Sequence, residues 1–207
     1  MDLGFELAFK YRNPVIMLSD GVIGQMMERC VLPPYKPRMT DEEIAAKYPW
    51  AACGKKGDRK PNILSSLDLD PYVMEKRNFV YQKKFQEIKA NEVRYVTTNV
   101  DDCDILIVAF GSAARISNKA MQELRKSGLK VGLLRPITLW PFPEQAIREL
   151  SERVRHIYCI EINAGQMIDD VRLAVAERCP VDFYGRFGGM IPSPNEVVQF
   201  ILNKEQA

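Results

Sequence analysis

The chain has 207 residues, of which 46% are hydrophobic and 27% are charged, and its formal net charge is +2 at pH 7. A chain of this length and apolar content can bury the core of one large domain. The near-balanced charge argues against a dedicated nucleic-acid surface, which normally shows a clear basic excess. No apolar run approaches the roughly 18 residues of a membrane helix. The amino terminus also lacks the basic start and apolar stretch of a secretory signal.

The cysteines of the chain are widely scattered, with no short pair among them. Zinc and iron–sulfur sites usually show Cys-x2-Cys or a similar cluster, so we expect no metal site in this chain. An odd number of separated thiols is typical of reduced cysteines and indicates a cytoplasmic protein. The cysteines are Cys30, Cys53, Cys103, Cys159 and Cys179.

The first segment, residues 1–30, predicts a helix followed by a strand. Apolar residues from Leu3 to Tyr11 recur on one helical face, and the run PVIML at residues 14–18 predicts the strand. A helix and a strand alone cannot bury both faces of a strand this apolar. We therefore expect this segment to be the last unit of a larger α/β domain.

The second segment, residues 31–100, is rich in Pro, Lys and Asp and predicts an extended linker with one helix near residues 71–92. Asp70 is a suitable N-cap, and Pro71 suits the first helical position because an N–H would lack a partner there. Apolar residues then share one face of this helix, which should pack against another element. The basic run at residues 55–60 matches no phosphate-loop pattern, which favours a solvated loop over an anion site.

The third segment, residues 101–207, alternates apolar strand-like runs with helical stretches. Strands this apolar, each followed by one helix, predict a mostly parallel, doubly wound α/β sheet with helices on both faces. The predicted strands are residues 104–110, 130–135, 156–162 and 181–185, and the predicted helices are residues 113–126, 144–153, 165–178 and 195–203.

In an open parallel sheet, functional residues collect at the carboxyl ends of the strands. Arg135 and Glu161 end two strands that can be neighbours, so we expect an ion pair, or contact of one of them with a ligand or partner. Asn163 is predicted to cap the helix that begins near Gly165. The candidate interface or ligand edge comprises Arg115, Arg135, Glu161, Asn163, Arg186, Gly188 and Gly189.

The arginines of this edge should converge beside the turn at Gly188 and Gly189. Crowded guanidinium groups cost solvation and repulsion unless acids or anions answer them. Since Glu161 can neutralise only one or two of these arginines, we expect a partner's carboxylates or an anionic ligand to neutralise the others. The alternative is that the arginines fan out into water.

No catalytic pair is predicted in this chain. Ser112 lacks the second glycine of a nucleophile elbow. The single histidine, His156, opens a strand and so should lie at the opposite edge from Ser112, about 17–20 Å away. We expect its ring to find partners within the sheet. The glycine-rich loop at residues 185–189 lacks dinucleotide-site spacing, which favours a structural turn or an interface loop.

Seven strings of the sequence resemble one family, in the same order and over nearly the whole chain. They are KYRNPVIMLSDGVIGQM, LPPYKPR, EKRN, ILIVAFGSAARI, KVGLLRPITLWPFP, IEINAGQMIDDVRLAV and FYGRFGGMIPSP. This family is the 2-oxoacid:ferredoxin oxidoreductases. The likeness is greatest to the large, alpha-type thiamine-site subunit of the 2-oxoisovalerate (3-methyl-2-oxobutanoate) enzymes, and the corresponding 2-oxoglutarate subunit is the alternative.

The resemblance implies that residues 101–207 form a domain like the carboxyl-terminal domain of transketolase. It also implies that residues 1–30 end an incomplete pyrimidine-binding domain. Thiamine diphosphate and magnesium would lie between that domain and a partner subunit. The cofactor-activating glutamate would lie upstream, so no catalytic residue is expected here and the isolated chain should bind no cofactor and be inactive.

The resemblance implies a division of labour between several chains. The implied partners are a thiamine-diphosphate-binding beta-type subunit, a small gamma-type subunit and a ferredoxin-like subunit that carries iron–sulfur clusters. Ferredoxin would accept the electrons and coenzyme A the acyl group, while no nucleic acid or membrane is expected to take part.

A stand-alone nucleotide-binding or interaction module is the alternative from another class. The missing glycine fingerprint after Phe110 counts against a dinucleotide site. A receiver-like module would gather acids at the carboxyl ends of its strands. Asp101, Asp102 and Asp104 instead stand where their strand opens.

Overall fold

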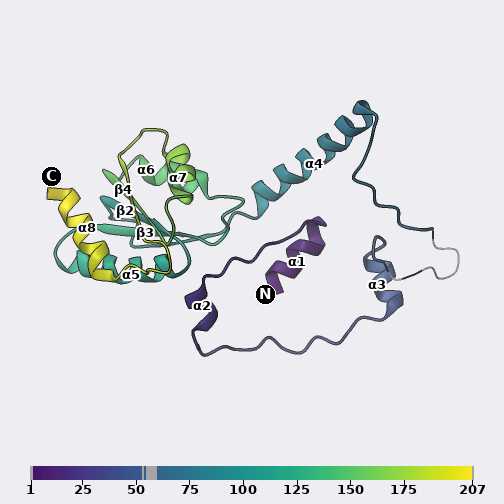
Figure 1. Cartoon of the computed structure of the whole chain (residues 1–207), viewed down its shortest axis with the longest axis horizontal. Helices are drawn as coiled ribbons and strands as arrows, with labels where there is room; N and C mark the ends of the chain where they lie inside the picture. The colour runs from purple at the N-terminus through teal and green to yellow at the C-terminus, as the bar shows by residue number, and fades with distance from the viewer. Residues whose placement is uncertain (1, 53, 55–59, 207) are drawn as a thin grey trace. The chain divides into compact units, whose positions relative to one another are not determined.

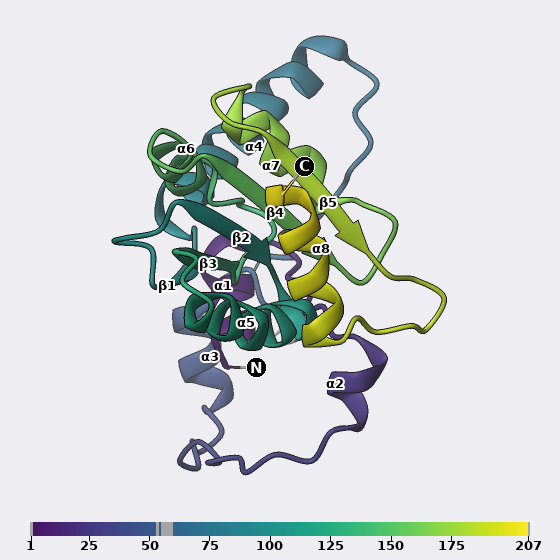
Figure 2. The same ribbon diagram turned by 90° about the vertical axis from the view of Figure 1, so that its left-hand side faces the viewer.

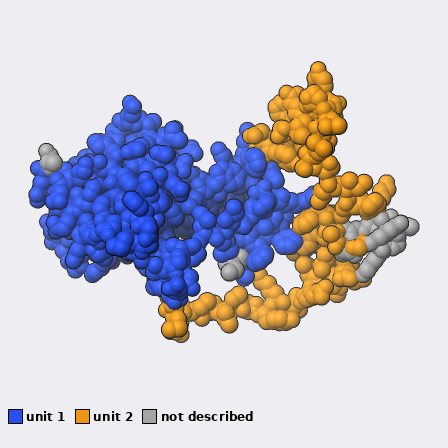
Figure 3. All heavy atoms as spheres, in the orientation of Figure 1, with its two compact units in different colours: residues 1–26, 83–207 blue, residues 27–82 orange. Residues whose placement is uncertain are grey.

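The computed structural model describes residues 2–52, 54 and 60–206 (Figure 1). The chain divides into two compact units, which Figure 3 colours separately: residues 1–26 with 83–207, and residues 27–82. The first unit contains a five-stranded sheet and the helices that cover it. The second consists largely of extended chain around one short helix, and it includes the beginning of a longer helix.

The sheet has the strand order β1-β3-β2-β4-β5. Its strands are β1 (Tyr95–Thr98), β2 (Ile105–Ala109), β3 (Val131–Pro136), β4 (His156–Glu161) and β5 (Val181–Gly185). β2 pairs in parallel with β3 and β4, and β4 with β5, whereas β1 pairs antiparallel with β3. The four predicted strands and their mostly parallel pairing are confirmed. The strand β1 was not predicted and falls in the predicted linker. Its residues are mostly exposed and therefore show no buried-strand pattern.

Helices cover both faces of this sheet (Figure 2). They are α5 (Gly111–Lys126) and α8 (Pro194–Gln206) on one face, and α6 (Glu144–Ser151) and α7 (Met167–Val175) on the other. Leu106 and Val108 belong to the core under α6 and α7, whereas Ile105 and Ile107 belong to the core under α5 and α8. Successive residues of a strand point to opposite faces, so β2 must be apolar throughout, and all of it is buried. The predicted doubly wound α/β fold is confirmed.

The amino-terminal helix forms, but the strand predicted after it does not. Helix α1 spans Asp2–Tyr11, and helix α2 spans Gly21–Gln25. The PVIML run between them has no strand assignment. Its side chains from Val15 to Leu18 are 41% to 81% exposed. A strand exists only beside a hydrogen-bonded neighbour, and no segment among the described residues pairs with this run.

The predicted linker helix is confirmed as α4 (Pro71–Asn91). The Asp70 Oδ1 accepts a hydrogen bond from the Tyr72 amide at 2.9 Å, as expected of an N-cap. The predicted packing is found at the last turns of the helix, where Ile88 is buried and Phe85 contacts Trp140, whereas Tyr81 on the same face is 42% exposed. Residues 55–59 of the basic run lie outside the described residues, so its prediction stays open.

A further helix, α3 (Asp41–Lys47), lies in the predicted linker. Thr40 and Glu43 form a capping box, in which each side chain accepts a hydrogen bond from the other's backbone amide. The T-x-x-E spacing was a readable signal for this helix start. The linker prediction overlooked it because α3 buries no residue and shows little apolar periodicity.

Candidate functional site at the carboxyl edge of the sheet

The parallel strands place their carboxyl ends at one edge of the sheet. Because β2 lies between β3 and β4, Arg135 and Glu161 are separated by two strand spacings, about 10 Å. The predicted ion pair between these two residues is therefore wrong. Arg135 is exposed and stands opposite Val96 of the antiparallel edge strand.

Glu161 is a buried carboxylate that binds the amino terminus of α7. It is 0% exposed, and its two oxygens accept hydrogen bonds from the amides of Gln166, Met167 and Ile168 at 3.3, 3.0 and 3.0 Å. The Asn163 Nδ2 donates a further bond at 3.0 Å. A helix amino terminus presents free N–H groups and partial positive charge, which is what a buried carboxylate needs.

The predicted cap at Asn163 is corrected by this arrangement. The Asn163 Oδ1 accepts from the Gly165 amide at 2.7 Å, which closes a turn before the helix rather than capping it. The capping carboxylate comes from the preceding strand. A charged residue at the end of a buried strand, a few residues before a helix start, was the signal in the sequence.

The neighbouring thiol of Cys159 is kept protonated by the same environment. Burial is the largest cause that raises the pKa of this thiol, and the negative charge of Glu161 adds to it. The Sγ lies 3.5 Å from the Glu161 Oε1, to which it donates. A protonated, buried thiol is a poor nucleophile, so this pair serves structure rather than covalent catalysis.

The start of α5 is bound by Asp20 from the amino-terminal segment. Ser112 is only 7% exposed, and its hydroxyl and amide both donate to the Asp20 carboxylate, which lowers the pKa of that acid. The Asp20 Oδ1 also caps α2 through the amides of Val22 and Ile23, at 2.9 and 2.8 Å. The start of a helix can bind an anion, and here a carboxylate of the same chain takes that place. Sequence reasoning missed Asp20, because its partner is distant along the chain.

His156 lies at the opposite edge of the sheet, as predicted. It opens β4 beside Ile105, its Nε2 lies 3.1 Å from the Asp182 Oδ2, and its Nδ1 lies 3.4 Å from the Tyr158 hydroxyl. The ring also stacks on Tyr158 with 4.3 Å between centroids. The expected partners within the sheet are confirmed, and Ser112 has no access to this imidazole.

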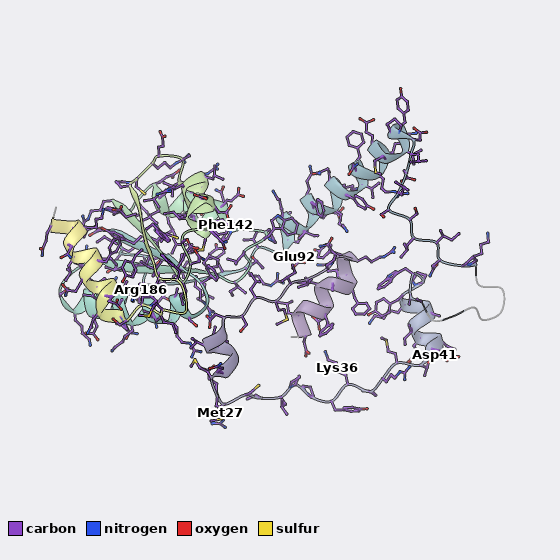
Figure 4. All side chains as sticks on the ribbon, viewed as in Figure 1. Met27, Lys36, Asp41, Glu92, Phe142 and Arg186 are labelled. Carbon is purple, nitrogen blue, oxygen red and sulfur yellow. The ribbon has the colours of Figure 1, made fainter. Side chains whose placement is uncertain are left out.

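The arginines of the candidate edge do not share Glu161. Arg186, which Figure 4 labels, instead pairs with Glu196 of α8, whose Oε1 lies 2.5 Å from the Arg186 Nη1. Glu196 also accepts from the Ser193 amide at 2.7 Å and donates its own amide to the Ser193 hydroxyl, a second capping box. Arg115 is exposed on the first turns of α5. Whether a partner or an anion completes this edge stays a prediction.

The turn that follows β5 needs its glycines. Gly188 and Gly189 have φ of +67° and +87°, a left-handed backbone that other residues adopt at a cost. A Cβ at either position would meet nothing within 4 Å, and Phe187 and Met190 beside them are exposed. The loop therefore faces outward as a tight turn, as predicted, and its use as an interface stays a prediction.

Two comparisons with known proteins bear on this fold and edge. Residues 103–197 match the family model described as "Pyruvate:ferredoxin oxidoreductase core domain II". Over 200 residues, which are 95% of this chain and 54% of the relative, the chain is 41% identical to the ketoisovalerate oxidoreductase subunit VorB of Methanothermobacter thermautotrophicus. The chain belongs to the 2-oxoacid:ferredoxin oxidoreductase family.

The chain has more distant relatives of the same kind. It is 30% identical to the 2-oxoglutarate synthase subunit KorA of Archaeoglobus fulgidus, over 95% of this chain and 55% of the relative. It superposes with a TM-score of 0.57 on a 2-oxoglutarate:ferredoxin oxidoreductase from Magnetococcus marinus, at 22% identity over 66% of this chain and 24% of that chain. This last likeness shows the fold alone. The chain spans about half the length of the curated relatives that it matches.

The described part of this chain, residues 2–52, 54 and 60–206, shows no cluster of acidic, histidine or cysteine side chains that could hold a metal ion. A magnesium-bound diphosphate needs oxygen ligands around the ion, so no step of cofactor chemistry is assigned to these residues. In the same ranges, no helix is long and apolar enough to cross a membrane.

Proposed function

We propose that this chain is the carboxyl-terminal part of an alpha-type subunit of a 2-oxoacid:ferredoxin oxidoreductase. The observation that carries the proposal is the 41% identity to a ketoisovalerate oxidoreductase subunit over 95% of this chain. The whole enzyme would decarboxylate a 2-oxoacid oxidatively, transfer the acyl group to coenzyme A and pass electrons to ferredoxin. This chain would supply structure and a subunit interface, and it would be inactive alone.

The proposed substrate is a branched-chain 2-oxoacid, 2-oxoisovalerate. Identity to the two VorB subunits of ketoisovalerate oxidoreductases is 41% and 40%, against 30% for the 2-oxoglutarate synthase subunit of Archaeoglobus fulgidus. An activity on 2-oxoglutarate is the alternative outcome of the test below.

In this proposal, residues 1–30 form the end of a pyrimidine-binding domain, and residues 101–207 correspond to the carboxyl-terminal domain of transketolase. Residues 31–100 form the linker between these two parts. The exposed residues 15–18 support the first assignment, because an apolar run of this kind is normally covered. Ile16 and Leu18 in this run are 81% and 72% exposed. An adjoining sheet would pair with them and bury both.

The proposed cofactors and partners follow from the same assignment. Thiamine diphosphate and magnesium would bind between the pyrimidine-binding domain and a beta-type subunit, and iron–sulfur clusters would lie on a ferredoxin-like subunit beside a small gamma-type subunit. The assembly would be cytoplasmic. The exposed Arg115, Arg135 and the Gly188–Gly189 turn are the proposed contacts of this chain with its partners.

The test is affinity purification of the tagged chain from its own cells, followed by turnover of the recovered assembly. We expect partner chains with a diphosphate-binding domain and with cysteine clusters, and acyl-coenzyme A formation that is faster with 2-oxoisovalerate than with 2-oxoglutarate. Preference for 2-oxoglutarate would overturn the substrate assignment. Recovery of the chain alone, or an assembly that oxidises neither acid, would overturn the proposed function.

Calorimetry on the isolated chain gives a second, independent test. We expect no heat of binding when thiamine diphosphate and magnesium are titrated into it, because the described residues gather no metal site. Tight binding by the chain alone would show that it carries a complete cofactor site and would overturn the proposed division of labour.

A further inference from the structure

A buried carboxylate joins the amino-terminal helix to the α/β domain. Glu92 follows the last residue of α4, and it is only 4% exposed. Its Oε1 accepts from the Lys10 Nζ at 2.7 Å and from the Tyr11 hydroxyl at 2.6 Å. Both donors stand at the carboxyl end of α1, more than eighty residues away along the chain. Figure 4 labels Glu92 where α4 ends beside α1.

The other oxygen of the same carboxylate holds the entry to the sheet. The Arg94 Nη1 donates to the Glu92 Oε2 at 2.7 Å and to the Glu92 carbonyl at 3.2 Å. The Arg94 carbonyl in turn accepts from the amides of Ile137 and Thr138, which follow β3. One side chain therefore connects α1, the end of α4 and the backbone beside β1 and β3.

A surface ion pair would be a weak joint, worth at most about 1 kcal/mol. Glu92 differs because its carboxylate is almost fully buried and every oxygen has a charged or short hydrogen-bond partner. Breaking such a group by removing one partner leaves an uncompensated buried charge, which is strongly unfavourable. Hydrogen bonding from Lys10, then from Tyr11, lowers the pKa of Glu92 to about 2, so this carboxylate is ionised at neutral pH.

A second contact strengthens the same connection. The Lys84 Nζ on α4 donates to the Asn13 Oδ1 at 3.0 Å, just after α1 ends. Farther along α4, Phe85 meets Trp140 edge to face with 5.7 Å between ring centroids. The last turns of α4 thus contact both α1 and the loop after β3, and Glu92 lies where these contacts end.

We propose that Glu92 is a positioning residue that holds α1 and the segment after it at a fixed place on the α/β domain. The inference rests on the proposed function in one respect: α1 belongs to the part of the subunit assigned to cofactor binding. Glu92 would then hold the cofactor-binding part and the α/β domain as one body during turnover. Lys10 and Tyr11 are its contacts on one side and Arg94 on the other.

The attachment of α1 through Glu92 is tested first on the 207-residue chain itself by hydrogen exchange. Glu92→Gln and Tyr11→Phe should accelerate exchange of the α1 amides, by about tenfold and about threefold, since each removes hydrogen bonds that hold this helix. The amides of β2 should be unaffected in both variants. Glu123→Gln is the matched control, because Glu123 also binds two lysines, Lys119 and Lys126, but on the surface of α5.

The outcomes of this experiment distinguish a residue that holds α1 in place from one that stabilises the whole domain. Faster exchange in α1 alone supports the proposal. Unchanged exchange in α1 for both variants overturns it, and so does an equal acceleration in α1 and β2. The Tyr11→Phe variant keeps the carboxylate and both of its cations, so it gives a result even where Glu92→Gln does not fold.

The positioning role is tested next in the assembled enzyme. Glu92→Gln should lower kcat about tenfold and change the KM for 2-oxoisovalerate less than about twofold, because misplacement of a domain affects geometry more than substrate binding. Unchanged kcat beside a loosened α1 overturns the positioning role. An assembly of the unmodified chain that turns over no 2-oxoacid overturns the proposed function instead. In that case the hydrogen-exchange result alone decides whether Glu92 holds α1 on the α/β domain.

Discussion

Replacing Glu161 with Gln tests whether one buried carboxylate stabilises the junction between β4 and α7. The Glu161 Oε2 accepts from Asn163, Gln166 and Met167, and the Oε1 accepts from Ile168. The glutamine oxygen can replace only one of these acceptors. Its amide group would then face an N–H donor, and the favourable charge at the helix amino terminus would be lost.

The magnitude follows from these losses. A buried donor without a partner costs about 1–3 kcal/mol, and a charge at a helix terminus contributes about 0.3–1 kcal/mol, or up to about 2 kcal/mol when partly buried. We therefore expect Glu161→Gln to lower the free energy of unfolding by about 2–4 kcal/mol. Glu161→Ala would remove every acceptor and should cost more.

Urea denaturation of the chain, followed by circular dichroism, measures this loss. Glu177→Gln is the matched control, because Glu177 is an exposed glutamate just beyond the other end of α7. It should change the free energy of unfolding by less than about 0.5 kcal/mol. If Glu161→Gln is equally neutral, the carboxylate does not stabilise the junction and the reasoning fails.

Three further predictions concern other contacts of the first unit. The pKa of Glu92 is lowered to about 2 in the folded chain, so its stabilisation should be present above about pH 4.5 and lost as the pH falls toward 2. A Glu92→Gln chain should be less stable by about 1–2 kcal/mol at pH 7, after allowance for the exposed Lys10. In acid denaturation its free energy of unfolding should converge with that of the wild type, and a constant difference would contradict the prediction. Gly185→Ala would place a Cβ 2.4 Å from the Asn163 carbonyl and from the Phe183 ring, so thermal unfolding should show a loss of about 1–3 kcal/mol; Gly24→Ala, where nothing lies within 4 Å, is the control that should stay near the wild type. Arg186→Glu should destabilise the chain by setting two acids together at a half-exposed site; adding Glu196→Gln, which removes one charge but keeps an oxygen for the Ser193 amide, should recover most of the loss in urea unfolding, and no recovery would argue against the pair.

The strands and helices of residues 101–207 were readable because burial on both faces of a sheet demands continuous apolar runs. The same rule misled at residues 14–18, where the run is apolar but no neighbouring strand exists in the described structure. Pairing between the edge residues was not readable. The order β3-β2-β4 separates Arg135 from Glu161, and strand order does not follow from order along the chain.

The polar contacts that matter most were the least predictable. Glu92 is buried by donors from distant segments, and Asp20 meets Ser112 only once the chain has folded back. Sequence patterns describe neighbours along a helix or strand, whereas these residues depend on tertiary contacts for their environment. The capping boxes at Thr40 and Ser193 are local and follow the readable T-x-x-E and S-x-x-E spacing, but the sequence analysis did not predict either of them.

The carboxylate that spans the β4–α7 junction also limits how this part of the protein can change length. Glu161 reaches amides five to seven residues ahead, so an added residue between them would carry the helix start beyond the reach of one side chain. The loop at residues 186–193 has no such constraint at its outer turn, where open space surrounds Gly188 and Gly189. A residue inserted after β4 should therefore destabilise the isolated chain more than a residue inserted at the outer turn after β5.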